Sequence, residues 1–366
     1  MSAVRTAFAA AHVVMKSSYG EIDHSIERPG APDVIAAQID WDATVAIRRD
    51  LISHGFHIAE AMDTAQRNFL DWSVAWELIR RCGELESGFV AGAGADHLAS
   101  IDDRDQLVDA IAWQAAEIGR MGGVPILLSQ PWLCEQRYDS DAFVRFYADV
   151  IERIEGEVLI HWLGAMFLPS LDGYFPGDSF DRVMDLDPTK VRGCKLSLLD
   201  AAFERRVRDR LHPREQVVLT GDDFNFAELI IGDDPVVTGW TELGGRPLAL
   251  GRFSHALLGV LDGIAAPAGR ALEHLTNGDV DAARELLGPC EELGRVVFEA
   301  PTMHYKAGLA FLSWLNGRQE TFDLVNHQER ARDRAHYERV AVAAEACGAI
   351  ETAAARIRLE SWRAAN

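Results

Sequence analysis

The chain contains 366 residues, of which 48% are hydrophobic and 25% are charged, proportions typical of a globular protein that needs no disulfide support. The formal net charge of -21 argues against nucleic-acid partners and anionic membrane surfaces, because both are bound by basic faces. No apolar segment approaches the roughly 18–20 residues that span a bilayer. The five cysteines are scattered and form no C-x-x-C pair, which is typical of a reducing compartment. We therefore expect a soluble, cytoplasmic protein.

Short apolar runs alternate with helical patterns along most of the chain. The runs lie at 6–14, 56–62, 88–94, 124–132, 157–162, 191–199, 216–223 and 253–261, although 236–240 competes for the last place. Helical patterns lie between them at about 41–54, 71–81, 104–120, 140–154 and 201–211. Continuous apolar runs indicate strands that are buried on both faces, as in a parallel sheet. Eight such units over about 260 residues predict an α/β protein with a (β/α)8 TIM barrel.

Beyond Gly263 the pattern is almost wholly helical. Helices are expected at 267–277, 279–287, 291–299 and 304–315, followed by a charged tail from about 320. We divide the chain into a barrel, residues 1–265, and a C-terminal helical region packed on it, residues 266–366. The segment 330–339 is typical of a solvent-exposed charged helix. No G-x-G-x-x-G motif opens a helix after the first strand, which counts against a dinucleotide-binding fold.

Lys195 stands out on chemical grounds. Only four of the 36 basic residues are lysines, and Lys195 lies in the apolar run 191–199. Arginine stays protonated at any useful pH, whereas a desolvated lysine can lose its proton and become a nucleophile. We interpret Lys195 as a candidate Schiff-base lysine. The alternative is a lysine at a strand end whose amine reaches water.

Polar residues follow several of the apolar runs. Because the chemistry of such barrels sits at the C-terminal ends of the strands, these residues are candidates for one site. They are His12, Glu60, Asp63, Gln130, Trp132, His161, Asp222, Asp223 and His255. Buried polar groups are costly unless they are paired, so their convergence favours a site over chance. A lone histidine such as His12 or His255 is nevertheless more often a structural group.

A resemblance to a known family rests on two neighbouring runs. Gly193-Cys194-Lys195, followed one helix later by Leu219 to Asp223, resembles the lysine strand and the Gly-Asp-Asp strand of the dihydrodipicolinate synthase/N-acetylneuraminate lyase family. Segments 89–94, 126–132, 264–267 and 301–308 add to the likeness, which spans most of the chain. The chain resembles a divergent branch of that family. The resemblance implies a class I aldolase-like barrel, an imine between lysine and a 2-oxo acid, and a homodimer or homotetramer.

Only part of the family's site carries over. Lys195 matches the imine lysine, and His161 occupies the position of a proton-relaying tyrosine. The threonine pair after the second strand is reduced to Thr64, and the carboxylate-binding arginine has no clear counterpart in 163–169. Asp63 would repel a carboxylate. A neutral keto-sugar or similar oxo substrate is therefore expected, with Glu60, Asp63 and Gln130 binding hydroxyls and Trp132 covering a sugar ring.

These observations predict a carbon–carbon lyase or aldolase that works through an imine on Lys195. His161, titrating near neutrality, would move protons, and dehydration of a similar substrate is equally open. No cofactor beyond the covalent imine is expected. One alternative is a metal-dependent isomerase or hydrolase with ligands from His12, Glu60, Asp63, His97, His161 and Asp222. Another is a non-catalytic small-molecule-binding relative. The segment 235–251, absent from the family pattern, is predicted to be a lid or a subunit contact.

Overall fold

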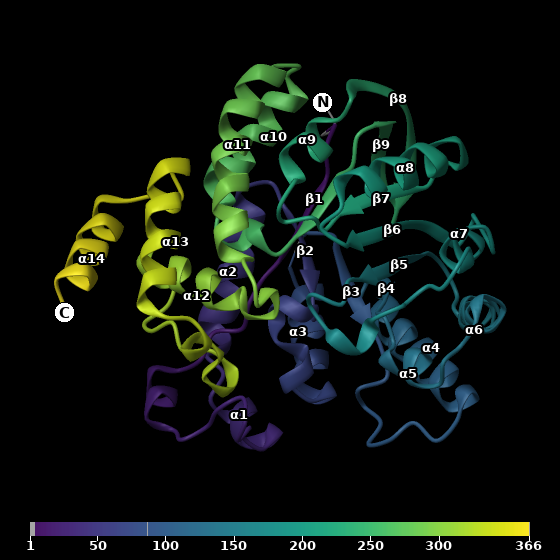
Figure 1. Ribbon diagram of the computed structural model, residues 1–366, viewed down its shortest axis with the longest axis horizontal. Helices are drawn as coiled ribbons and strands as arrows, with labels where there is room; N and C mark the ends of the chain where they lie inside the picture. The colour runs from purple at the N-terminus through teal and green to yellow at the C-terminus, as the bar shows by residue number, and fades with distance from the viewer. Residues whose placement is uncertain (1–3, 86, 366) are drawn as a thin grey trace.

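The predicted barrel is confirmed. The computed structural model describes residues 4–85 and 87–365, and eight parallel strands in it close into one barrel (Figure 1). The strands are β1 (Ala7–Ala10), β2 (His57–Glu60), β3 (Phe89–Ala93), β4 (Val124–Leu127), β5 (Val158–Leu163), β6 (Val191–Ser197), β7 (Val217–Thr220) and β10 (His255–Leu258). Each pairs with the next in this order, and β10 pairs with β1.

Side chains alternate between two apolar layers along these strands. Phe8, Leu159 and Leu219 belong to a cluster built from strand residues, which is the interior of the barrel. Their neighbours, such as Ile160 and Cys194, belong to a larger cluster that includes the helices, which is the outer layer. Because successive side chains of a strand point to opposite faces, every second residue of each strand faces the barrel interior.

Aspartate residues fix where most barrel helices begin. The helices of the barrel are α1 (Pro32–Ala37), α2 (Trp41–Ser53), α3 (Trp72–Gly83), α4 (Arg104–Arg120), α5 (Pro131–Glu135), α6 (Ser140–Arg153), α7 (Ser179–Met184), α8 (Ala201–Leu211) and α9 (Phe226–Ile231). Asp40, Asp71, Asp103, Asp139 and Asp200 each cap a helix by accepting a backbone N–H three residues later. The predicted bounds of α4 and α8 are confirmed at both ends.

A hairpin interrupts the regular alternation before the last strand. It consists of β8 (Asp234–Leu243) and β9 (Arg246–Arg252), which pair antiparallel, so the competing run at 236–240 lies outside the barrel. Leu248 and Leu250 join the interior cluster together with Phe8 and Val124. Since Phe8 and Val124 lie near the starts of their strands, the hairpin closes the N-terminal end of the barrel. The predicted lid role is therefore wrong, because a lid would lie at the opposite end.

The C-terminal helices lie along one side of the barrel. They are α10 (Ala265–Thr276), α11 (Val280–Val297), α12 (Lys306–Leu315), α13 (Arg334–Cys347) and α14 (Ala353–Ala364). Figure 1 shows α10 and α11 side by side, with α13 and α14 farther from the barrel. Two helices were predicted where α11 runs unbroken through Pro289. In the segment 330–339, α13 buries His336 and Tyr337, so this helix is only partly exposed.

Within the described residues, no helix combines the length and the apolar character needed to cross a membrane.

We predict that the hairpin contributes to stability through its inward side chains. Leu248 is 2% exposed, and Leu248→Ala should lower the free energy of unfolding by about 2–5 kcal/mol, because it leaves a cavity at the closed end of the barrel. Val236 on the same hairpin is 60% exposed, so Val236→Ala should change it by less than about 0.5 kcal/mol. Urea unfolding followed by circular dichroism measures both, and equal effects would contradict this packing.

Candidate active site

Lys195 projects from the inner face of β6 near the open end of the barrel. Its neighbours Cys194 and Leu196 pack in the outer layer, so alternation directs Lys195 inward. On the adjacent strands it is paired in register with His161 of β5 and Leu219 of β7. A β-carbon on Gly221 would lie 2.9 Å from the lysine Cε, so this glycine leaves room for the lysine stem. Lys195 is partly buried and keeps some access to solvent.

Burial brings the proton affinities of Lys195 and Asp223 close together. It lowers the pKa of the Lys195 amine to about 8, although the charges of Asp223 and Asp63 oppose the change. It raises the pKa of the Asp223 carboxyl to about 7, against the effects of a backbone hydrogen bond and of the charge on Lys195. That bond comes from the N–H of Val260, 2.9 Å from Asp223 Oδ1. The charge on each group therefore affects the protonation of the other near neutral pH.

His161 is a neutral imidazole at the barrel interior. It is 2% exposed, and burial, helped by the charge of Lys195, lowers its pKa well below the usual range. The prediction that it titrates near neutrality is therefore wrong, because that prediction took no account of desolvation. Nε2 lies 3.4 Å from Ser197 Oγ, and Nδ1 has no hydrogen-bond partner among the described residues. The ring is thus available to bind a substrate as a neutral group.

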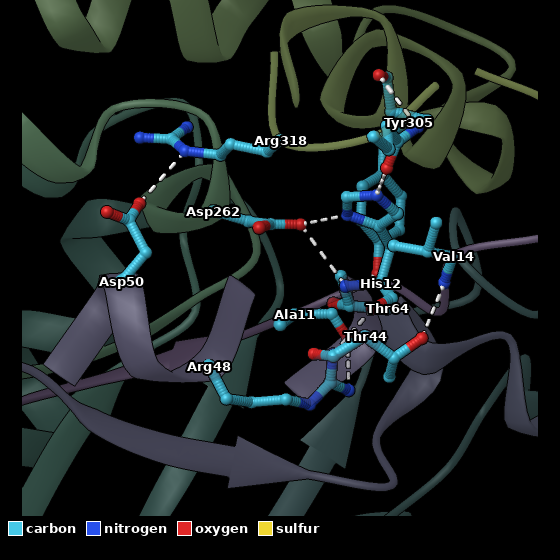
Figure 2. Close-up of polar contacts among 12 residues, drawn as sticks. Ala11, His12, Val14, Thr44, Arg48, Asp50, Thr64, Asp262, Tyr305 and Arg318 are labelled. Atoms are coloured by element: carbon cyan, nitrogen blue, oxygen red, sulfur yellow. Dashed lines mark hydrogen bonds and ion pairs between the residues drawn. The ribbon is translucent and has the colours of Figure 1, made fainter. Parts of the chain in front are cut away.

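Asp63 and Thr64 follow β2 in the short 3₁₀ helix η2 (Asp63–Ala65), and both contact the C-terminal region. The amine of Lys306 lies 2.8 Å from Asp63 Oδ2, in an ion pair. The hydroxyls of Thr64 and Tyr305 are 2.8 Å apart (Figure 2). The repulsion of anions expected from Asp63 is therefore largely offset by Lys306. The direct substrate contacts of Asp63 and Thr64 stay predictions.

His12 is held by partners on both sides of its ring. Its Nδ1 lies 2.5 Å from Asp262 Oδ2, and its Nε2 lies 2.6 Å from Gln319 Oε1. The same Asp262 oxygen accepts the backbone N–H of His12 (Figure 2). Gln319 directs its amide nitrogen to the carbonyls of Ala310 and Thr321, which fixes its oxygen toward the histidine. His12 thus joins the first strand to the C-terminal region, and substrate binding by it stays a prediction.

Glu60 and His255 do not lie where the sequence placed them. Glu60 points to the outer layer and forms a buried two-point ion pair with Arg48 of α2, at 2.8 and 2.9 Å. Figure 2 shows the guanidinium of Arg48 beside the chain that follows β1. His255 begins β10, so it lies at the closed end, where Nδ1 accepts the N–H of Thr6 and Nε2 donates to the Ala249 carbonyl. The predicted positions of both residues at the mouth are therefore wrong.

The remaining predicted residues lie after β4 and β7. Gln130 is buried, and its side-chain amide donates to the Leu128 carbonyl, while Trp132 of α5 packs edge-on against Tyr138. Asp222 is buried and accepts hydrogen bonds from Asn225, in a tight turn that orients the following Asp223. Asp222 is thus engaged by its own loop. Substrate contacts of Gln130, Trp132, Asp222 and Asp223 stay predictions.

The six residues of the metal alternative do not converge. In the part of the chain that the structure describes, one group of three potential ligands has its ligand atoms within 4.8 Å of one another: Asp323, His327 and Glu329. It lies in the C-terminal region, and His327 Nδ1 is 2.9 Å from Glu329 Oε1, as an ion pair would be. The geometry therefore gives no support to metal ligands from the barrel strands.

Tyr305 and Lys306 are the residues that sequence reasoning missed. Tyr305 immediately precedes α12 and Lys306 begins it, and both side chains contact the loop after β2. A signal was present, because Lys306 is one of only four lysines and lies in the segment 301–308 that resembles the aldolase family. Nothing local, however, indicates that a residue 241 positions away contacts Thr64.

The comparisons with known proteins confirm the resemblance at the level of the fold. The structure of dihydrodipicolinate synthase from Bacillus clausii superposes with a TM-score of 0.64 at 14% identity, covering 94% of this chain and 98% of that one. The structure of N-acetylneuraminate lyase from Fusobacterium nucleatum, complexed with pyruvate, gives a TM-score of 0.61 at 11% identity, covering 93% of this chain and 96% of that one. Dihydrodipicolinate synthase from Agrobacterium tumefaciens gives 0.60 at 15% identity, covering 94% and 99%.

Sequence comparison is less informative about activity. No curated protein matches the sequence of this chain. A family model described as "Protein of unknown function (DUF993)" matches residues 1–363. The match covers nearly the whole chain, including both the barrel and the C-terminal helices. The chain therefore belongs to the DUF993 family.

Proposed function

We propose that this protein is an imine-forming lyase or aldolase that acts on a small oxo substrate through Lys195. The observation that carries the proposal is the pair of Lys195 and Asp223 in the open end of the barrel. Burial lowers the pKa of the lysine amine to about 8 and raises that of the carboxyl to about 7. The fold, shared with aldolase-type lyases, supports the same reading.

The first half of the reaction forms the imine. The uncharged Lys195 amine adds to the substrate carbonyl carbon, and a proton moves from nitrogen to oxygen to give a carbinolamine. Asp223 in its acid form then protonates the hydroxyl, which leaves as water. The products are a protonated imine and the Asp223 carboxylate. The net charge of the site is unchanged, and each of the two new charges has the other to offset it.

The second half breaks a bond next to the imine. The Asp223 carboxylate takes the proton of the substrate's β-hydroxyl, the Cα–Cβ bonding pair moves into the imine, and an aldehyde leaves. The resulting enamine takes a proton back at carbon, and water hydrolyses the imine to release the second product and Lys195. His161, as a neutral imidazole, binds a substrate oxygen or hydroxyl through its unpartnered Nδ1 rather than titrating.

The charges around the site favour a neutral, hydroxylated substrate such as a keto-sugar. Each lysine near the mouth has a carboxylate to balance it: Asp223 for Lys195 and Asp63 for Lys306. Arg67, the arginine that follows β2, is occupied by Asp96 and Gln114. These groups offer no uncompensated cation to a carboxylate, so binding relies on hydrogen bonds.

Trapping with sodium cyanoborohydride tests the imine. Incubation with dihydroxyacetone should add mass at Lys195, located by peptide mass spectrometry. Lys195→Ala should abolish the adduct, because the other buried lysine near the mouth, Lys306, is held in an ion pair with Asp63. Lys16 is exposed, so the Lys16→Ala variant should form the same amount of adduct at Lys195 as the wild type. Pyruvate, an anionic substrate of similar size, should trap more slowly. An adduct at a different lysine would contradict the mechanism, and faster trapping of pyruvate would contradict the substrate class.

The pH dependence of trapping tests the role of Asp223. The reactive form carries one proton on the pair, so the rate should peak between pH about 7 and about 8. Below this range Lys195 is an ammonium, and above it Asp223 cannot donate. Asp223→Asn should slow trapping about 100-fold, as expected for loss of a general acid. In the pH profile of Asp223→Asn, the rise in trapping rate that follows deprotonation of Lys195 should move to lower pH, because the carboxylate charge that raises the lysine pKa is gone. The decrease in rate at alkaline pH should disappear.

The exposed Asp234 of β8 provides the control for the Asp223→Asn substitution. Asp234→Asn should keep the wild-type rate and the wild-type profile. If Asp223→Asn also kept both, the carboxyl would not be the acid of this reaction.

A further inference from the structure

Tyr305 enters the open end of the barrel from the C-terminal region. It is 3% exposed, and it lies against the loops that follow three strands. Its hydroxyl contacts Thr64 after β2, and its ring lies edge-on to Phe167 after β5 at 6.1 Å. A β-carbon on Gly259, directly after β10, would lie 3.1 Å from the tyrosine Cε2. A side chain that meets the C-terminal ends of several strands lies where the chemistry of this fold takes place.

The ring of Tyr305 is held in one orientation. Phe298 at the end of α11 stacks on it with a centroid distance of 4.2 Å and an interplanar angle of 14°. On its other side, the amine of Lys306 lies 4.4 Å from the ring centroid while it pairs with Asp63. Stacking and packing thus fix the ring, and only the hydroxyl proton remains free to rotate.

The hydroxyl of Tyr305 is kept protonated. Burial raises its pKa well above the usual value, and the negative charges of Asp63 and Asp223 act in the same direction. Asp63 and Asp223 also act on the Lys195 amine, so the tyrosine and the lysine share two charged neighbours. When Thr64 donates its proton to the tyrosine oxygen across their 2.8 Å contact, the tyrosine proton can point at a third oxygen, and Asp63 then competes with a substrate oxygen for it.

We propose that Tyr305 is a catalytic residue supplied by the C-terminal region, whose hydroxyl donates a hydrogen bond to the substrate oxygen that becomes negative when Lys195 adds to the carbonyl. Thr64 is its positioning residue. A neutral, preoriented donor in a desolvated site stabilises developing negative charge without reorganisation. The inference rests on the proposed imine chemistry, and it explains why the C-terminal helices are tied to the loop after β2.

Tyr305→Phe tests this role, because it keeps the stacked ring and removes only the hydroxyl. With dihydroxyacetone and cyanoborohydride, the maximal trapping rate at Lys195 should fall about 100-fold, the scale found for losing one such donor, while the half-saturating concentration changes little. Tyr337 is a buried tyrosine of the same region whose hydroxyl donates to the Glu329 carbonyl. Tyr337→Phe should trap at the wild-type rate.

Thr64 provides a second pair of variants. Thr64→Ser keeps a hydroxyl and should trap nearly as fast as the wild type, whereas Thr64→Val removes it at equal size and should slow the maximal rate. A purely structural role would instead lower the melting temperature of Thr64→Val without slowing its maximal rate of trapping. Wild-type trapping together with an unchanged rate in Tyr305→Phe would overturn the Tyr305 proposal alone. If the wild type formed no adduct, the imine mechanism and the role of Tyr305 would both be wrong.

Discussion

Desolvation of a basic group on β6, Lys195, and of an acidic group in the loop after β7, Asp223, is the constraint on which the site depends. In water, Lys195 would be an ammonium and Asp223 a carboxylate at neutral pH. The barrel interior penalises both charges, so the pKa of the amine falls and that of the carboxyl rises. Gly221 is part of the same arrangement, because any larger residue would press on the lysine stem and on Ser197. As a result, the amine and the carboxyl both change their protonation state near neutral pH.

The C-terminal region contributes to this site rather than only covering the barrel. It supplies Lys306, which balances Asp63, and Tyr305, which contacts Thr64. It also supplies Gln319, which together with Asp262 holds His12 at the end of the first strand. Without Lys306, two carboxylates would face Lys195, and their combined charge would favour the ammonium form. Balancing one of them lets burial act on the amine.

The sequence predicted the fold well because its signals are local. Each parallel strand is a continuous apolar run, and an aspartate before each of α2, α3, α4, α6 and α8 marks where the helix begins. Lys195 was recognisable because lysine is rare in this chain. The orientation of Glu60 was predicted wrongly. At the end of a strand, the sequence alone does not say whether a side chain faces the barrel interior or the surrounding helices. Tyr305 was missed because its contact with Thr64 depends on the three-dimensional packing of the C-terminal region.

Some buried polar side chains of the barrel have hydrogen-bond or ion-pair partners for all their polar atoms, and others do not. Glu60 and His12 are satisfied on every side by Arg48, Asp262 and Gln319, and removing one member of such a set would leave an unpaired group in the core. His161 differs, because one of its ring nitrogens is buried without a partner among the described residues. A native core rarely leaves such a group unpaired. His161 is paired in register with Lys195 on the adjacent strand, so its unpartnered Nδ1 is the group through which the proposed mechanism has it bind a substrate oxygen or hydroxyl.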